Sequence, residues 1–187
     1  MKRLVILASG DGTNTQQLID HFKGSKVTIS LVISNNPDAN VLRRAIIEGI
    51  PTLLINKESF YNGEEVLRRL LSEKPDLIVC AGFLWKVPDR ILNAFPNKVI
   101  NIHPALLPKF GGKGMYGLNV HKAVINSKEK ESGITIHFLN GNYDEGKTLF
   151  QATCEVKTDD TPEILAQKVQ ELEHRHFPKA IEQLLIP

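Results

Sequence analysis

Short apolar runs alternate with longer segments of helical periodicity along this chain, and this alternation constrains the fold more than any other feature. Strand-like runs occupy residues 4–8, 27–33, 52–55, 77–81, 134–139 and 148–156, and another run ends at residue 102. Helical patterns cover residues 14–22, 41–48, 64–72, 88–94 and 119–126, and a long helix begins near the proline at 162. The order predicts a single α/β domain over residues 1–187, with a mostly parallel sheet and helices on both of its faces.

The overall composition limits the classes of function that fit this chain. Apolar residues make up 42% and charged residues 24% of the 187 positions, and the formal net charge is +2. These values are ordinary for a globular protein, and the charge is too small to indicate nucleic acid or a membrane surface as the main partner. The only cysteines, Cys80 and Cys154, lie far apart in apolar stretches. This placement favours reduced thiols over a disulfide or a metal site and predicts a cytoplasmic protein.

The Asn101-Ile102-His103-Pro104 run lies where an apolar strand stops and a glycine-rich loop begins. Alternate residues of a strand share one face, so the amide of Asn101 and the imidazole of His103 are expected side by side. They lie at the carboxyl end of the strand, where open α/β sheets bind ligands. An amide donor beside a titratable ring suits a reaction in which a carbonyl oxygen gains negative charge while a proton moves. The alternative is a core histidine bonded to the backbone.

A second polar segment, Ser9-Gly10-Asp11-Gly12-Thr13-Asn14, follows the first strand and precedes a helix. Its backbone N–H groups and the helix N-terminus form a candidate phosphate cradle. The segment lacks the lysine of a P-loop and the third glycine of the dinucleotide fingerprint. A tight strand-to-helix turn with a polar N-cap explains the same residues equally well.

Three further segments contribute candidate groups. Residues 81–88 contain apolar side chains that form either a slot for an aromatic ring or a plug over the core. Asp144 lies in a loop rich in Asn and Gly, and is expected either beside His103, where it would orient the ring, or in solvent as a turn residue. On the last helix, Gln170 and Glu173 share one face, which is either functional or simply packed and solvated.

The irregular stretch 104–118 is long enough to indicate a functional loop. Its lysines, Lys109 and Lys113, serve either to attract an anionic ligand or to keep the loop soluble. Of the histidines outside the strand end, His121 is expected to face this loop and His137 to pack within an alternating strand.

Four of these segments together resemble the phosphoribosylglycinamide formyltransferase family. Asn-Ile-His-Pro at 101–104, with Leu-Leu-Pro-Lys at 106–109, marks the wider folate-dependent formyltransferases, and the segments 9–14, 81–83 and 144–146 match in addition. The resemblance spans almost the whole chain, and related formyltransferases with an additional domain are too long for 187 residues. It implies the Rossmann-like, three-layer formyltransferase fold with a seven-stranded sheet.

The resemblance also implies a reaction and its residues. A formyl group would pass from the cosubstrate 10-formyltetrahydrofolate to the amine of glycinamide ribonucleotide in purine biosynthesis, with Asn101, His103 and Asp144 as catalytic residues and no metal. The phosphate and ribose of the acceptor would contact Gly12, Thr13, Asn14, Thr15, Gln170 and Glu173. The folate would contact Phe83, Leu84, Trp85, Lys86, Val87, Leu92, Ile100, Asn140 and Gly141. These small molecules would be the partners of a monomer or weak homodimer.

The chain departs from the family pattern on the folate side. Trp85 stands where many members have arginine, and residues 114–118 replace a run of the Pro-Gly-Leu-His kind. Residues 57–65 contain no clear counterpart of a basic residue that could grip the glutamate tail of folate. Lys86, Lys109 or Lys113 could replace it.

The chemistry expected from these groups is direct transfer without a covalent enzyme intermediate. The amine attacks the formyl carbon, and Asn101 and protonated His103 hold the tetrahedral oxyanion. Asp144 holds the charged ring in place, helps to order a water and relays the proton to the leaving folate nitrogen. Two other functions remain open: a nucleotide-binding or regulatory module that has lost the reaction, and a formyltransferase that acts on an amino sugar nucleotide.

Overall fold

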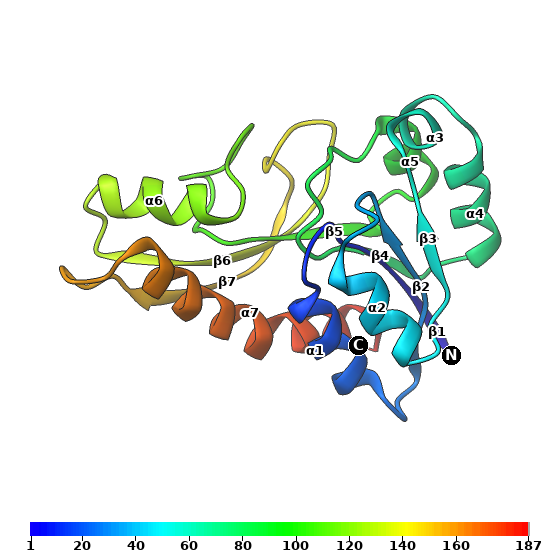
Figure 1. The fold of residues 1–187 in the computed structure, drawn as a ribbon, viewed down its shortest axis with the longest axis horizontal. Coiled ribbons are helices and arrows are strands. Elements are labelled where there is room, and N and C mark those ends of the chain that lie inside the picture. The colour runs from blue at the N-terminus through cyan, green and yellow to red at the C-terminus, as the bar shows by residue number, and fades with distance from the viewer. Residues whose placement is uncertain (187) are drawn as a thin grey trace.

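The computed structural model describes residues 1–186, which form one seven-stranded sheet with helices on both faces (Figure 1). The strands are β1 (Lys2–Leu7), β2 (Val27–Ser34), β3 (Thr52–Leu54), β4 (Leu77–Cys80), β5 (Val99–His103), β6 (Glu131–Phe138) and β7 (Thr148–Glu155). Their order across the sheet is β3-β2-β1-β4-β5-β6-β7. The first five strands are parallel, whereas β6 is antiparallel to both of its neighbours. The mostly parallel, three-layer fold expected from the sequence is confirmed.

Two groups of helices cover the two faces of the sheet. One face packs against α1 (Thr13–Phe22), α2 (Asn40–Ile47), α6 (Leu118–Asn126) and α7 (Pro162–Leu185). The other face packs against α3 (Lys57–Tyr61), α4 (Glu65–Glu73) and α5 (Asp89–Ala94). The sequence did not predict α3, because five residues are too few to show an apolar period. Within residues 1–186, no helix is both long and apolar enough to cross a membrane.

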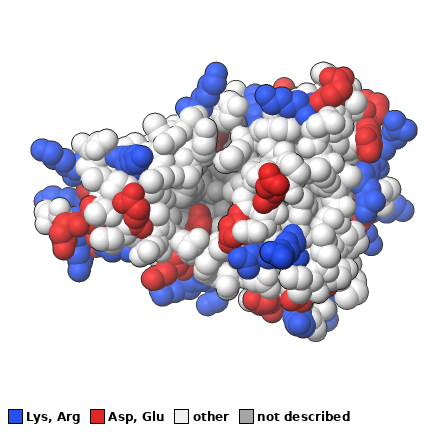
Figure 2. Space-filling model, in the orientation of Figure 1, with Lys and Arg blue, Asp and Glu red and all other residues white. Residues whose placement is uncertain are grey.

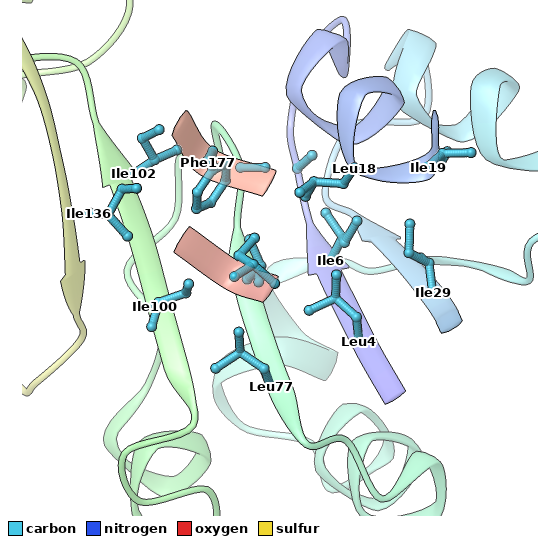
Figure 3. Packing of buried hydrophobic residues seen from close by; sticks show 14 of the residues in the cluster. Leu4, Ile6, Leu18, Ile19, Ile29, Leu77, Ile100, Ile102, Ile136 and Phe177 are labelled. Atoms are coloured by element: carbon cyan, nitrogen blue, oxygen red, sulfur yellow. The ribbon is translucent and has the colours of Figure 1, made fainter. Parts of the chain in front are cut away.

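Strand alternation divides the core into two layers. Leu4 and Ile6 of β1 are buried on the α1 and α7 side, and Val5 and Leu7 are buried on the opposite side. Figure 3 shows the first layer, in which apolar side chains of the central strands approach Leu18, Ile19 and Phe177 from the helices. Burial of apolar residues on both faces is typical of a central parallel strand.

Ser9 joins three loops at the carboxyl edge of the sheet. Its hydroxyl donates a hydrogen bond to Oδ1 of Asn35 across 2.6 Å and accepts one from the backbone N–H of Leu84 across 2.9 Å. Its own backbone N–H donates to the carbonyl of Gly82 across 3.1 Å. The loops that follow β1, β2 and β4 are therefore fixed relative to one another.

Thr135 of β6 anchors the start of the long loop that follows β5. Its hydroxyl donates to the Ala105 carbonyl across 2.7 Å and accepts from the Leu107 N–H across 3.0 Å. From residue 104 to residue 117 the chain forms neither helix nor strand, as the sequence predicted.

Candidate active site

A cavity of about 480 Å³ opens at the carboxyl ends of the parallel strands. Its walls come from the loop after β4, the end of β5, residues 112–118, the loop between β6 and β7, and parts of α1, α6 and α7. Figure 2 shows this face of the molecule hollowed near its centre, with acidic side chains at the edge of the hollow. The cavity lies at the edge of the sheet where ligands bind in open α/β folds, and its volume suits a small-molecule ligand.

Asn101 and His103 both line this cavity from the end of β5. Strand pairing places His137 of β6 directly opposite Asn101. Nδ1 of His137 lies 3.0 Å from the Phe138 carbonyl oxygen and must donate to it, so Nε2 is left as an acceptor. The amide of Asn101 donates to that Nε2 across 3.2 Å. This contact fixes the amide and leaves its second N–H available to a ligand.

Asp144 reaches both imidazoles from the loop between β6 and β7. Its Oδ2 lies 3.7 Å from Nδ1 of His103, and its Oδ1 lies 3.6 Å from Nε2 of His137. Oδ2 also accepts a hydrogen bond from the backbone N–H of Gly112 across 2.9 Å. The backbone of Asp144 is left-handed, with φ of 54°, a conformation that aspartate tolerates better than most residues. The structure thus brings together the three side chains that the sequence singled out for catalysis.

His103 is neutral near neutral pH in this environment. Burial lowers the pKa of its imidazole and outweighs the opposing effects of the Asp144 charge and the Phe110 carbonyl. Nε2 lies 2.8 Å from the carbonyl oxygen of Phe110, so the single proton of the neutral ring lies on Nε2. Nδ1 then presents a lone pair toward Asp144.

Asp144 is a carboxylate in the same environment. Burial acts to raise the pKa of its carboxyl group, but the hydrogen bond from the Gly112 N–H and the nearby His103 ring together lower it. The negative charge of Asp144 favours protonation of the His103 ring. Protonation is favoured further when a second negative charge develops on a ligand at the other side of the ring. The pair is therefore suited to take up and release a proton during a reaction.

Two further histidines belong to the site, and the sequence did not assign either of them a role there. His137 is completely buried, as expected, but its Nε2 also accepts a hydrogen bond from Asn101 and lies 3.6 Å from Oδ1 of Asp144. His121 of α6 lines the cavity and is 5% exposed, and its Nδ1 has no hydrogen-bond partner in the described part of the chain. Burial, with a contribution from the charge of His103, lowers the pKa of His121.

The polar residues of α1 and α7 meet at one end of the cavity. Nδ2 of Asn14 donates to Oε2 of Glu173 across 2.8 Å, and Nε2 of Gln170 donates to the Thr13 hydroxyl across 3.2 Å. Burial raises the pKa of Glu173 to about 7, against the opposing effect of the Asn14 hydrogen bond. Asn14, Gln170 and Glu173 line the cavity. Thr15 does not, because its side chain is completely buried beneath the helix.

Helix α2 holds the loop between β1 and α1 in place. Arg44 donates from Nε to the carbonyl oxygen of Asp11 and from Nη2 to its carboxylate, each across 2.8 Å. Asn40 adds a hydrogen bond to the same carboxylate across 2.9 Å. Gly12 has φ of 77°, and a Cβ there would lie 2.6 Å from Val41, so only glycine fits. No sequence signal indicated Arg44, because it lies far from this loop along the chain.

The residues expected on the folate side fall into two groups. Phe83, Leu84, Trp85, Lys86, Val87 and Asn140 line the cavity. Three others, Leu92, Ile100 and Gly141, do not line it, and their contact with folate stays a prediction. Ile100 alternates with Asn101 and is therefore buried on the α7 side of the sheet, while Leu92 packs against the core on the opposite side. Among residues 1–186, no cluster of three His, Cys, Asp or Glu side chains is placed to hold a metal ion.

Sequence comparisons identify similar proteins over nearly the whole chain. A profile of the family described as formyl transferase matches residues 2–181. The chloroplastic phosphoribosylglycinamide formyltransferase of Arabidopsis thaliana is 37% identical, and the match covers 96% of this chain but 64% of the relative. The phosphoribosylglycinamide formyltransferase of Bacillus subtilis is 31% identical, and there the match covers 99% of this chain and 95% of the relative. This chain therefore spans less than two thirds of the chloroplastic relative and nearly all of the bacterial one.

Solved structures show the same similarity in three dimensions. The crystal structure of phosphoribosylglycinamide formyltransferase from Bacillus halodurans matches with a TM-score of 0.90 at 32% identity, covering 99% of this chain and 96% of that one. The Coxiella burnetii protein of the same name, in complex with CHES, matches with a TM-score of 0.88 at 36% identity, covering 98% of this chain and 87% of that one.

Proposed function

This chain belongs to the formyl transferase family, and on that premise we propose that it is a phosphoribosylglycinamide formyltransferase formed by a single domain over residues 1–187. It would transfer the formyl group of 10-formyltetrahydrofolate to the amine of glycinamide ribonucleotide, in purine biosynthesis. The convergence of Asn101, His103 and Asp144 on one cavity carries this proposal. A binding module would have no need of a carboxylate, an imidazole and a fixed amide that line one cavity.

The proposed reaction is a direct transfer between two bound small molecules. The amine nitrogen of the acceptor forms a bond to the formyl carbon, and the carbonyl oxygen becomes an oxyanion. The bond from that carbon to the folate nitrogen then breaks, and a proton moves from the amine to the departing nitrogen. No atom of the protein enters a covalent intermediate.

Asn101 and His103 are placed to stabilise the oxyanion. The free N–H of the Asn101 amide supplies one donor, because the other N–H is held by His137. Nε2 of His103 supplies a second donor when the oxyanion replaces the Phe110 carbonyl as its acceptor. Protonation of Nδ1 would then place an N–H toward Asp144, which stabilises the imidazolium.

The opposite end of the cavity would orient the acceptor. The N-terminus of α1 and the loop before it offer backbone N–H groups to the phosphate, with Gly12, Thr13, Asn14 and Thr15 contributing main chain. Gln170 and Glu173 of α7 would contact the ribose. Anchoring the phosphate places the amine against the formyl carbon, which is an effect of orientation rather than of chemistry.

The test is an absorbance assay with purified protein, glycinamide ribonucleotide and a 10-formyl folate, run beside His103→Ala. We expect turnover by the parent and loss of turnover in the variant. An amino sugar nucleotide offered in competition should not be formylated. Equilibrium binding of both substrates without turnover in the parent would contradict the proposal and favour a binding module.

Partners and location follow from the same proposal. The substrates are small molecules, and the protein would act in the cytoplasm as a monomer or weak homodimer. Cys80 and Cys154 are both free thiols, which is compatible with a reducing compartment. Size-exclusion chromatography over a range of protein concentrations measures the oligomeric state.

A further inference from the structure

His121 has no role in the proposed reaction, although it lines the cavity and is 5% exposed. It lies on the face of α6 that also carries Val124, whose side chain packs into the core. Helix α6 lies beside the N-terminal half of α7 (Figure 1). The imidazole is therefore held at the cavity wall by a packed helix.

Nδ1 of His121 is buried and has no hydrogen-bond partner within residues 1–186. A buried polar group that loses its bonds to water and gains no other partner destabilises the protein. Among the buried side-chain atoms of this kind in the described range, those of Asn14 and His121 belong to residues that line the cavity. A ligand in the cavity can supply the partner that His121 lacks.

The ring of His121 is neutral and lies close to the reacting groups. Burial lowers its pKa, and the charge of His103 lowers it further, so the two rings are near enough to interact. A neutral imidazole has one N–H donor and one lone pair. It can bond to an amide, which presents both an N–H and a carbonyl, without adding a positive charge beside the amine that reacts.

The acceptor is expected along the wall that joins α1 to α6. The residues of α7 that line the cavity share one face over about two turns, and they are Ala166, Val169, Gln170 and Glu173. In glycinamide ribonucleotide an amide joins the ribose to the short segment that carries the amine. When the phosphate lies at α1 and the amine lies at His103, this amide lies between them, along α7.

We propose that His121 is a binding residue for the acceptor, and that its Nδ1 forms a hydrogen bond with the amide between the ribose and the reacting amine. The inference rests on the proposed function, since it takes the acceptor to be glycinamide ribonucleotide. With a proton on Nδ1 the bond goes to the amide carbonyl, and without one Nδ1 accepts from the amide N–H. Either bond directs the amine toward the formyl carbon.

The kinetic test compares the parent with His121→Phe and His121→Asn. Phenylalanine removes both ring nitrogens and keeps a flat ring, whereas asparagine keeps a polar atom near the position of Nδ1. We expect His121→Phe to raise KM for glycinamide ribonucleotide about tenfold, the usual scale for one hydrogen bond lost in a buried site, and to leave KM for the formyl donor unchanged. His121→Asn should recover part of the affinity.

His174→Phe is the matched control, because Nε2 of His174 is also buried without a partner in the described chain and His174 does not line the cavity. This variant should leave KM for both substrates unchanged. Urea unfolding of His121→Phe should show no loss of stability in the free protein, since Nδ1 has no protein partner to lose. An equal rise in KM for both substrates, or the same rise in His174→Phe, would overturn the proposal.

Nitrogen NMR of labelled histidine rings tests the contact without turnover. The signals of His121 are identified by their absence from His121→Phe. Glycinamide ribonucleotide alone should shift the Nδ1 signal, and the direction of the shift distinguishes a donating from an accepting nitrogen. Ribose 5-phosphate has the same anionic end but no amide, and should leave the signal in place when its phosphorus signal shows saturation. A shift with ribose 5-phosphate, a shift only with the formyl donor, or no shift would contradict the contact.

Failure of the reaction and failure of the contact give different results. A parent in which glycinamide ribonucleotide shifts the His121 signal but no product forms would remove the proposed function and retain the contact. A parent that forms product while glycinamide ribonucleotide leaves the His121 signal in place would remove the contact alone.

Discussion

Asn14 donates a hydrogen bond to Glu173 across 2.8 Å and so joins the first helix of the chain to the last. The pair lies at the end of the cavity where the acceptor is proposed to bind. The Oδ1 atom of Asn14 is buried, and no residue in the described range 1–186 donates to it.

Replacing Glu173 with Gln should change the pH dependence of stability. The folded pKa of about 7 lies above the reference value of 4.5, so the folded state keeps a proton that the unfolded state loses. The free energy of unfolding of the parent therefore falls by on the order of 3 kcal/mol as pH rises from about 4.5 to about 7. Glu173→Gln has no such loss, and its amide oxygen still accepts the hydrogen bond from Asn14. Urea unfolding at pH 5, 6, 7 and 8 measures the free energy of unfolding of both proteins. The same pH dependence in both would contradict the raised pKa of Glu173.

Asn101→Ala should reduce kcat and leave KM for both substrates nearly unchanged. The variant removes one donor to the oxyanion, which typically costs ~3 kcal/mol, or about two orders of magnitude in rate. Steady-state kinetics measures the effect, and circular dichroism confirms that the variant folds. A variant with the parent's kcat would show that this amide does not contact the oxyanion.

Asp144→Asn should lower the pKa of His103 further. Burial lowers the pKa of His103, and the negative charge of Asp144 raises it. The variant removes that charge and keeps the effect of burial. NMR titration of labelled histidine rings measures the shift. His174 is an internal reference, because burial alone lowers its pKa and no charge of this site acts on it. A rise in the pKa of His103 would mean that Asp144 does not stabilise the imidazolium.

Arg44→Ala should raise KM for glycinamide ribonucleotide about tenfold with little change in kcat, since two hydrogen bonds that hold the proposed phosphate loop are lost. Arg43→Ala is the matched control, because its side chain is exposed on the same helix. Asp11→Asn in the Arg44→Ala background should recover part of the affinity by removing an unpaired negative charge near the phosphate. Equal effects of the two arginine variants would exclude this positioning role.

The fold was predictable because alternation of strands and helices is a local property of the sequence. The proximity of Asn101 and His103 was predictable for the same reason, since residues two apart on a strand share a face. The contact of His137 with Asn101 was not predictable, because it depends on the register between β5 and β6. Arg44 likewise reaches its loop only through packing of α2 beside α1.

Three residues of the expected folate side do not line the cavity. Ile100 is adjacent to Asn101 on β5, so strand alternation itself places its side chain on the opposite face. The family resemblance implies that folate contacts Ile100, and this contact stays a prediction. The short helix α3 was missed because its signal lies in a capping box between Asn56 and Ser59 rather than in an apolar period.

The alignment of β5 with β6 has a consequence for recovery of the protein from denaturant. A slip of one residue would turn His137 to the far side of the sheet and set Ile136 against Asn101. Misaligned chains would keep their helices and strands but would be catalytically inactive. Specific activity after refolding therefore reports strand alignment, which a far-ultraviolet spectrum does not detect.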